Sequence, residues 1–418
     1  MHILFVTPVY PPVPGGAERI ASALATRLAG QGYRVTVVTS LARVETDLWL
    51  GCGHNIEEEK PTENLHVIRC PILPMPGGWR GLVAWRNGMT ILSLLPGSQA
   101  GTLMHMAQRV PGIKGMDEAF DRLKTPVDVV HGFNLSWEHA SLAGWNYARS
   151  RDLPYVVTPF AHLGSWRVAL KYVMDHQRHM MSEADALLAM TSIEVDCLRR
   201  WGVSPQQATV IGAGLDPLPL AIDSQEVMDS YDLTHPFILF IGRTSYDKGA
   251  IHAAQAILAL REQCVEVDLV LAGRITEEFE RYYERLPLEK RAYLKPLGVF
   301  DQNAQAQLHA LLEKTSMLIL PSRMDSFGLV LLEAWAHGKP VIAANAGGIP
   351  GVVDDGKDGI LVPFGDVTAL AKAIHLLLEE KTLNRSMGEN GREKVAKRYN
   401  WDHLTNRVLD VYKTVLHQ

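Results

Sequence analysis

A single carboxylate lies inside an almost wholly apolar segment in the C-terminal half of the chain. Residues 327–337, FGLVLLEAWAH, are apolar on nearly every side of a helix, and Glu333 lies among them. A buried carboxylate without a partner costs roughly 3–5 kcal/mol. Its partner is either a buried arginine or lysine of the same chain, or a bound ligand. The helix alone leaves both interpretations open.

The beginning of this helix favours the ligand. Ser326 is a suitable N-cap, and Gly338 is a suitable C-terminal stop. Glu333 follows Ser326 by seven residues and Leu329 by four, so it shares a face with the helix N-terminus. Free backbone N–H groups there suit a phosphate, and the carboxylate suits a pair of hydroxyls. Phosphate near vicinal hydroxyls describes a nucleotide.

Strands and helices alternate around this segment and elsewhere in the chain. Short apolar runs from Met317 to Leu320 and from Val341 to Ala344 flank the helix. At the N-terminus, a strand from Ile3 to Thr7, a glycine-containing turn and a helix lead into a second strand, Arg34 to Thr39. Such alternation predicts parallel sheets and the α/β fold class.

Two residues follow the carboxyl ends of predicted strands, where parallel sheets bind ligands. Gly16 comes between the first strand and its helix, where a missing side chain lets a ligand approach the backbone. His162 follows a strand from Tyr155 to Thr158. The alternatives are that Gly16 only forms a turn and that His162 only packs in a loop.

A second domain is indicated after the proline-rich residues 216–220, which we interpret as a linker. A new strand from Phe237 to Ile241 is followed by a loop that carries Arg243 and Lys248. We therefore predict an N-terminal domain of residues 1–215 and a C-terminal domain of residues 216–399. A last helix, residues 400–418, is expected to pack back on the first domain.

The composition is that of an ordinary globular protein, with 47% hydrophobic residues, 21% charged residues and a formal net charge of −5. A nucleic-acid partner is not expected, because such proteins normally show a basic excess. The four cysteines form no C-x-x-C pair, which argues against a zinc site or a disulfide framework. No apolar run approaches the roughly 20 residues that span a bilayer, and the N-terminus reads as a strand. We expect a cytoplasmic protein.

Residues 43–126 are the least interpretable part of the sequence. Within them, residues 79–96 (WRGLVAWRNGMTILSLLP) combine two tryptophans and two arginines with an apolar run. An ordinary packed helix is one interpretation of this segment. The other is a helix that lies on a membrane surface or lines an acceptor groove.

In order and spacing, four motifs resemble the retaining glycosyltransferases of family four. They are PPVPGGAE at residues 11–18, FIGRTSYDKG at 240–249, PSRMDSFGL at 321–329 with Glu333, and GGIP at 347–350 with Asp358-Gly359. The resemblance covers nearly the whole chain. It implies the GT-B architecture, in which two Rossmann-like domains face each other across a cleft.

The resemblance implies transfer of a hexose from a UDP- or GDP-sugar to a hydroxyl of an unknown sugar, polysaccharide or lipid-linked acceptor. The leaving diphosphate gains negative charge, which Arg243 and Lys248 would stabilise. The backbone of residues 326–329 (Ser326, Phe327, Gly328 and Leu329) would bind the phosphates at the helix N-terminus. Glu333 would bind the ribose hydroxyls.

Further roles are implied residue by residue. The family has two glutamates seven residues apart, and Asp325 occupies the first position here, one methylene shorter, where the carboxylate would contact the donor sugar. His162 would lie near that sugar, Gly16 near the diphosphate or the acceptor, and the backbone of Val299 near the base. The family's usual Asn-Gly-Val-Asp is replaced by residues 212–216, GAGLD, to which we assign no role.

We predict no cofactor and no essential metal. Metal-dependent transferases commonly use an Asp-x-Asp pair, and no two aspartates of this chain are two positions apart. The pair His176 and His179 lacks a third ligand candidate. We expect front-face displacement, in which the leaving phosphate takes the acceptor's proton. The alternatives are a nucleotide-sugar epimerase or another GT-B enzyme, and a noncatalytic nucleotide-sugar-binding homologue.

Overall fold

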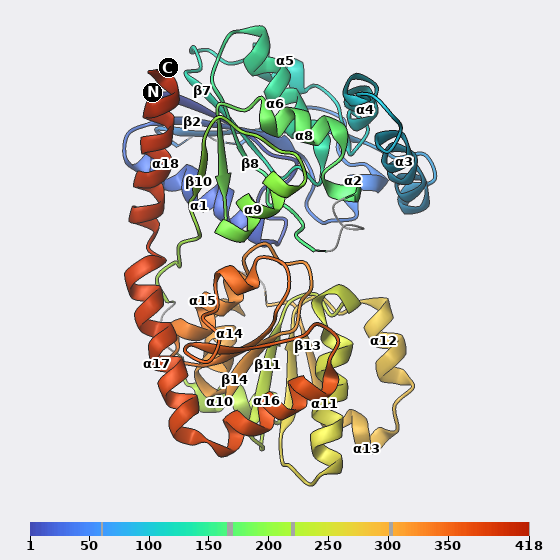
Figure 1. Cartoon of the computed structure of the whole chain (residues 1–418), viewed down its shortest axis with the longest axis vertical. Helices are drawn as coiled ribbons and strands as arrows, with labels where there is room; N and C mark the ends of the chain where they lie inside the picture. Colours follow the sequence, from blue (N-terminus) through green and yellow to red (C-terminus); the bar gives the residue numbers. More distant parts are fainter. Residues whose placement is uncertain (60–61, 165–169, 219–221, 301–303, 418) are drawn as a thin grey trace. The chain divides into compact units, whose positions relative to one another are not determined.

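The computed structural model describes residues 1–59, 62–164, 170–218, 222–300 and 304–417. The chain forms two compact units (Figure 1), the first comprising Met1–Gly212 with Trp401–Gln418 and the second Ala213–Asn400. Each unit has its own sheet and its own hydrophobic core. The predicted α/β class is thus confirmed. Of the expected linker, Pro219 and Leu220 lie outside the described residues.

The first unit is built on a sheet in which β1 lies between β2 and β7. Among the described residues the strand order is β10-β9-β8-β7-β1-β2-β4-β3, and every neighbouring pair is parallel except β3 with β4. The strands are β1 (His2–Val6), β2 (Arg34–Ser40), β3 (Glu57–Glu58), β4 (Leu65–Cys70), β7 (Val129–Phe133), β8 (Tyr155–Thr158), β9 (Ala186–Ala189) and β10 (Ala208–Val210). β1 is apolar without alternation because both faces of the sheet are covered.

Helices and a small hairpin surround this sheet. The helices are α1 (Gly16–Gly30), α2 (Asp47–Leu50), α3 (Gly78–Ser93), α4 (Ala100–Ala107), α5 (Met116–Asp121), α6 (Glu138–Ser150), α8 (Asp175–Ser182), α9 (Ser192–Arg200) and α18 (Trp401–Leu416). The hairpin pairs β5 (Ile72–Leu73) with β6 (Gly112–Ile113) in antiparallel fashion. Residues 79–93 of the segment with two interpretations thus form most of α3.

The chain returns to the first unit through its last helix, α18. This helix contacts α1 and β9. Tyr412 is fully buried, and its hydroxyl shares a hydrogen bond with Nδ1 of His131 on β7 at 2.6 Å. Arg407 donates to the carbonyl of Val210 on β10 at 2.7 Å. The C-terminal helix therefore belongs to the first sheet's layer of helices, as Figure 1 shows in red.

The second unit is built on an entirely parallel sheet. Its strands are β11 (Phe237–Ile241), β12 (Asp268–Ala272), β13 (Leu294–Gly298), β14 (Met317–Leu320), β15 (Val341–Ala344) and β16 (Gly359–Val362). Their order in the described chain is β13-β12-β11-β14-β15-β16, so the order reverses between β11 and β14. This is the doubly wound arrangement of nucleotide-binding folds.

The helices of the second unit connect and cover these strands. They are α10 (Ser224–Ser230), α11 (Ala250–Glu262), α12 (Glu277–Glu284), α13 (Leu288–Arg291), α14 (Gln305–Lys314), α15 (Leu329–Ala336), α16 (Val367–Glu379) and α17 (Lys381–Arg398). In the part of the chain that the structure describes, no helix combines the length and the apolar character needed to cross a membrane.

Candidate active site

Two loops of the second unit begin side by side at the point where the strand order reverses. β12 and β13 lie on one side of β11, and β14 to β16 lie on the other. The loops that follow β11 and β14, residues 242–249 and 321–328, therefore start from adjacent strand ends. Open parallel sheets bind their ligands at such a point. Arg243, Lys248 and Asp325, predicted from the sequence, all lie in these two loops.

Backbone contacts join the two loops into one structure. The amide of Arg323 donates to the carbonyl of Asp247 at 3.0 Å, and the side chains of these two residues form an ion pair. Gly249 has a φ of 77°, and a Cβ there would lie 2.2 Å from the carbonyl oxygen of Pro321. Only glycine fits this close approach with this conformation. The position of the first loop thus fixes that of the second.

Lys248 and Asp325 form an ion pair between the loops. The Lys248 ammonium bonds to Oδ1 of Asp325, although 77 positions separate the two residues in the chain. The side chains are 27% and 17% exposed, so both are partly withdrawn from water. An ammonium carries three N–H donors, so a bond to one carboxylate oxygen leaves donors for the oxygens of a ligand. The pair places a cation and an acceptor side by side.

A glycine pair supports the backbone that carries Asp325. The amide of Gly348 donates to the Asp325 carbonyl at 2.7 Å. A Cβ on Gly348 would lie 1.9 Å from the carbonyl oxygen of Ser326, and one on Gly347 would lie 2.4 Å from that of Asp325. The GGIP motif is therefore explained by close backbone packing against the second loop.

The structure corrects the predicted start of the helix that carries Glu333. α15 begins at Leu329 rather than Phe327, and its N-cap is Gly328, with a φ of 85° and no side-chain capping bond. The cap prediction for Ser326 is wrong because the glycine pair holds this residue's backbone outside the helix, and Gly328 makes the left-handed turn into it. Leu331 donates to the Gly328 carbonyl at 3.0 Å. The amides of Leu329 and Val330 precede this first turn.

Glu333 and Phe327 are both buried beside this helix start. Glu333 lies one turn after Leu329 and is 5% exposed. The Phe327 ring packs edge-on against Tyr399, with 5.6 Å between ring centroids. The Phe327 side chain is thus part of the core, and the residue presents only its backbone to the loop surface.

Arg243 and Val299 follow β11 and β13, the two strands that flank β12. Arg243 is exposed, and the next residue, Thr244, is fully buried and accepts from the Thr276 amide at 2.9 Å. The Thr276 hydroxyl donates back to the Thr244 carbonyl at 2.9 Å. Val299 is exposed and follows Gly298 at the end of β13. Contact of Val299 with a base stays a prediction.

The remaining predicted residues, Gly16 and His162, belong to the first unit. Gly16 is the first residue of α1, in the connection that follows β1. His162 follows β8, and its ring contacts that of Tyr172 with centroids 4.4 Å apart. The preceding residue, Ala161, donates its amide to Oε1 of the fully buried Glu194 at 2.7 Å. Both residues lie at the carboxyl edge of the first sheet, as predicted.

Comparison with known proteins identifies the family. Residues 15–214 match the family described as a glycosyl transferase 4-like domain, and residues 225–394 match the one described as glycosyl transferases group 1. A D-inositol 3-phosphate glycosyltransferase of Xylanimonas cellulosilytica is 30% identical over 309 residues, which are 68% of this chain and 71% of that protein. The chain belongs to glycosyltransferase family four. The resemblance drawn from the motifs is confirmed.

Other proteins match along nearly the whole chain. A glycogen synthase of Mycobacterium tuberculosis is 27% identical over 422 residues, covering 99% of this chain and 94% of that protein. Among solved structures, sucrose-phosphate synthase from Thermosynechococcus elongatus has a TM-score of 0.72 at 22% identity and covers 100% and 99% of the two chains. Anabaena HepE in complex with UDP-glucose has a TM-score of 0.67 at 18% identity, covering 99% and 100%. These likenesses confirm the GT-B fold class.

In the second unit, the residues of the family motifs therefore have two different roles. Lys248, Asp325 and the start of α15 converge on one edge of the sheet, whereas several motif glycines only permit close backbone packing. In the described ranges, no group of three His, Cys, Asp or Glu residues could hold a metal ion. Independence of metal stays a prediction for this family member.

Two buried polar groups escaped the sequence analysis. In the first unit, Glu138 pairs with Nε2 of His176 at 3.0 Å and with Arg86 at 3.1 Å, behind the connection that follows β7. In the second, Lys394 pairs with Asp358 at 2.6 Å under α15. Each partner is distant in the chain, so no local signal joins them. The motif residue Asp358 thus binds α17 through its carboxylate, and its carbonyl accepts from the Trp335 indole of α15 at 2.8 Å.

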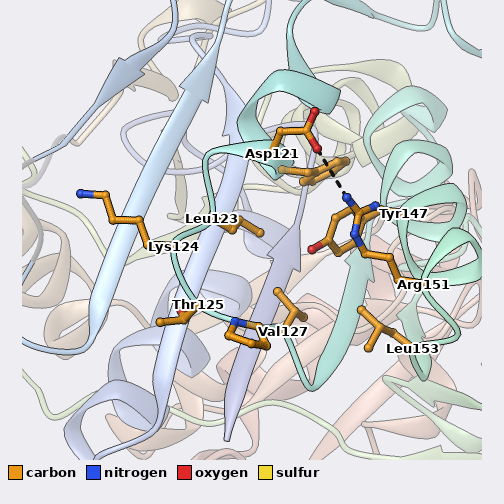
Figure 2. A pocket seen from close by; sticks show the side chains of 10 residues that line it. Asp121, Leu123, Lys124, Thr125, Val127, Tyr147, Arg151 and Leu153 are labelled. Atoms are coloured by element: carbon orange, nitrogen blue, oxygen red, sulfur yellow. Dashed lines mark hydrogen bonds and ion pairs between the residues drawn. The ribbon is translucent and has the colours of Figure 1, made fainter.

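A hollow of about 470 Å³ lies at the other edge of the first sheet (Figure 2). It is bordered by residues 120–127, which precede β7, and by Leu153, which precedes β8. Inside it, the Arg151 guanidinium lies 4.2 Å from the Tyr147 ring and pairs with Asp121 at 3.4 Å. Because it borders the amino ends of the strands, this hollow is not part of the candidate site.

Proposed function

We propose that this family-four glycosyltransferase moves a hexose from a UDP- or GDP-sugar to a hydroxyl of an acceptor, with retention and without an essential metal ion. The observation that carries this proposal is the Lys248–Asp325 pair beside the N-terminus of α15, where the sheet order reverses. A cation, a sugar-binding acceptor and free helix amides are the groups that a nucleoside diphosphate sugar requires.

In this proposal the protein acts on the leaving group. Cleavage of the bond between the anomeric carbon and the diphosphate leaves negative charge on the phosphate oxygens. Lys248, Arg243 and the amides of Leu329 and Val330 stabilise that charge, and Glu333 accepts hydrogen bonds from the ribose hydroxyls. Asp325 accepts from the donor sugar, and His162 orients it. The acceptor oxygen attacks from the leaving-group side, and the departing phosphate takes its proton.

The names of the relatives say more about the donor than about the acceptor. HepE has been solved with UDP-glucose, and a trehalose-phosphate synthase with a TM-score of 0.72 is described as UDP-forming. We therefore place UDP-glucose first among the donors to test. Named relatives make glycogen, α-maltose-1-phosphate or a D-inositol 3-phosphate glycoside, so the acceptor is taken only as a polyhydroxylated sugar or sugar phosphate. We propose the cytoplasm as the location, where the four free cysteines stay reduced.

Thermal shift with a panel of nucleoside diphosphates and nucleotide sugars tests the donor site. Saturating ligand at a hundredfold excess over its dissociation constant stabilises the folded protein by roughly 2.7 kcal/mol. We expect one base to raise the melting temperature equally with and without EDTA. The shift should vanish in Glu333→Gln and persist in the matched variant Glu379→Gln, whose side chain is exposed on α16. No shift with any nucleotide contradicts the donor site.

A second measurement separates transfer from the alternatives. Release of free nucleoside diphosphate only when an acceptor from a panel of sugars and sugar phosphates is present supports transfer, and the product's anomeric configuration by NMR tests retention. Conversion of the donor sugar without any acceptor indicates an epimerase. Nucleotide binding without turnover on the panel indicates a noncatalytic homologue.

A further inference from the structure

The inner face of helix α3 packs against the rest of the first unit. Leu82 and Met89 are buried on it, and the indole N–H of Trp85 donates to the carbonyl of Met106 at 3.1 Å. Arg86 on the same face pairs with Glu138 at 3.1 Å. Contacts with α2 and α4 complete this packing. The orientation of α3 on its own unit is therefore fixed by specific contacts.

The outer face of α3 carries several large apolar side chains, although a surface helix is normally polar there. Val83, Ile91 and Leu94 recur at helical spacing on this face and are 39%, 65% and 58% exposed. Leu95 and Trp79 extend the stripe at the two ends of the helix. We call these five residues the α3 stripe. Exposed apolar side chains that gather on one helix face, here with Asn87 between Val83 and Ile91, mark a contact surface.

Neighbouring apolar groups widen the stripe at its N-terminal end. The Trp79 ring lies against that of Trp49 on α2, with 5.0 Å between ring centroids. Leu50 on α2 and Leu73 on β5 are both more than half exposed. In Figure 1, α2, α3 and α4 stand together at one flank of the first unit.

The stretch of sequence that contains the α3 stripe carries formal charges of one sign. Residues 64–116 contain four arginines and one lysine but no aspartate or glutamate, in a chain whose formal net charge is −5. Arg80 on α3, Arg109 after α4 and Lys114 after β6 are exposed. The segment is therefore the cationic part of an anionic protein.

Acidic side chains of the neighbouring elements are already engaged. Asp47 of α2 accepts hydrogen bonds from the amides of Arg43 and Val44, at 2.8 and 3.0 Å. Asp175 of α8 accepts from the Gln99 amide at 2.6 Å. These bonds hold both carboxylates against the backbone of their own unit.

We propose that the α3 stripe binds the surface of an anionic lipid bilayer, with α3 lying in the plane of the interface. Apolar side chains reach the boundary of the acyl chains, Trp79 lies at headgroup level, and the exposed cations meet lipid phosphates. An anionic surface matches the net positive charge of residues 64–116. At 16 residues, α3 binds the interface and does not span it. This contact is independent of the donor site.

Flotation with lipid vesicles tests the proposal on the full chain. The probes are vesicles of phosphatidylcholine alone and of phosphatidylcholine with equal phosphatidylglycerol, at 50 and 500 mM salt. We expect the protein to float with the anionic vesicles at low salt and to dissociate at high salt, because exposed charges are screened. Arg80→Gln should lower the partition coefficient about fivefold.

Two double variants compare the stripe with a matched surface. Ile91→Asp with Leu94→Asp removes the apolar centre and should abolish flotation. Leu288→Asp with Arg281→Gln changes an exposed leucine and an exposed arginine of the second unit and should leave flotation unchanged. Each sample is also melted with and without the nucleotide that stabilises the wild type. An unchanged nucleotide shift in the stripe variant shows that folding and donor binding are intact.

Four outcomes overturn the proposal. The first three are no flotation of the wild type with anionic vesicles, equal flotation of the stripe variant, and equal binding to neutral vesicles. A fourth is a dimer in light scattering that the stripe variant abolishes, because the stripe would then bind a second copy of the chain. If the wild type binds no nucleotide, that result contradicts the proposed function. It does not affect the proposal that the α3 stripe binds lipid.

Discussion

Replacing Gly348 with alanine tests whether backbone contact positions the Asp325 loop. Gly348 has a φ of −86° and a ψ of −8°, a conformation that alanine also adopts, so the substitution adds no backbone strain of its own. The new Cβ would lie 1.9 Å from the carbonyl oxygen of Ser326, whereas ordinary contacts begin at 3.4 Å. One of the two segments must therefore move by about 1.5 Å. The contacted oxygen belongs to the backbone and the position of a Cβ is fixed by its own backbone, so no side-chain rotation relieves the contact.

The displacement predicts separate effects on stability and on activity. Forcing a methyl group into a packed contact costs about 1–3 kcal/mol. Each kcal/mol lowers the melting temperature of a domain of this size by about 2–4 °C, so the protein stays folded at 25 °C. Misplacing a reacting group by about 1 Å costs roughly a hundredfold in rate. We expect kcat/KM to fall about a hundredfold for Gly348→Ala.

Two assays follow these effects. Calorimetric titration measures the affinity for the nucleoside diphosphate that stabilises the wild type, and release of that diphosphate measures turnover. Gly30→Ala is the control, because a Cβ at this last residue of α1 meets no atom within 4 Å. Nucleotide affinity and turnover of Gly348→Ala within twofold of the wild type would refute the reasoning, since the loop would then not depend on this contact.

Three further substitutions test other parts of the structure. Lys248→Met removes charge next to Asp325 and should lower kcat by about a hundredfold to a thousandfold in initial-rate assays, with little change in melting temperature because the pair is partly exposed. Burial raises the pKa of Glu194 to about 7, so the folded protein retains a proton there, and stability should fall as the pH rises from about 4.5 to 7. In Glu194→Gln, the free energy of unfolding measured with urea should differ less between pH 5 and pH 8 than it does in the wild type. Lys394→Met leaves Asp358 buried without its cation and should destabilise the protein by about 3–5 kcal/mol in the same assay.

Each of these three substitutions has its own control or contradicting result. For Lys394→Met, the control is Lys397→Met, which removes an exposed ion pair with Glu393 on the same helix and should cost at most about 1 kcal/mol. Equal losses in the two would contradict the importance of burial. An unchanged pH slope in Glu194→Gln would show that another group titrates. Wild-type turnover in Lys248→Met would remove this lysine from the site.

The sequence predicted the elements of the site because each belongs to a local pattern. Apolar runs closed by glycine or proline predicted β11 and β14, and the loops after them held the charged candidates. The convergence of these loops follows from the strand order, which places β11 beside β14 although many residues intervene. The motif spacing indicated the family, and the family implied Rossmann-like domains. Local sequence patterns alone did not predict the ion pair between Lys248 and Asp325.

The errors and omissions have a common physical cause. Ser326 has the right chemistry for an N-cap, but contact with Gly348, some 20 positions along the chain, decides where its backbone lies. In the same way, the partners of Glu138 and Asp358 come from helices far along the chain. Local propensities do not contain such contacts, so they misplace helix ends and overlook buried ion pairs.

The shortened carboxylate at position 325 can be interpreted from these contacts. Asp325 bonds to Lys248, which lies in a loop that Gly249 presses against Pro321, and the Asp325 backbone is held by Gly348. A side chain one methylene shorter than glutamate therefore needs no long reach, because its cationic partner is fixed close by. The substitution preserves the pair at the edge of the sheet while drawing the carboxylate back toward the loop. We infer that it alters which donor sugar fits and leaves the diphosphate-binding groups unchanged.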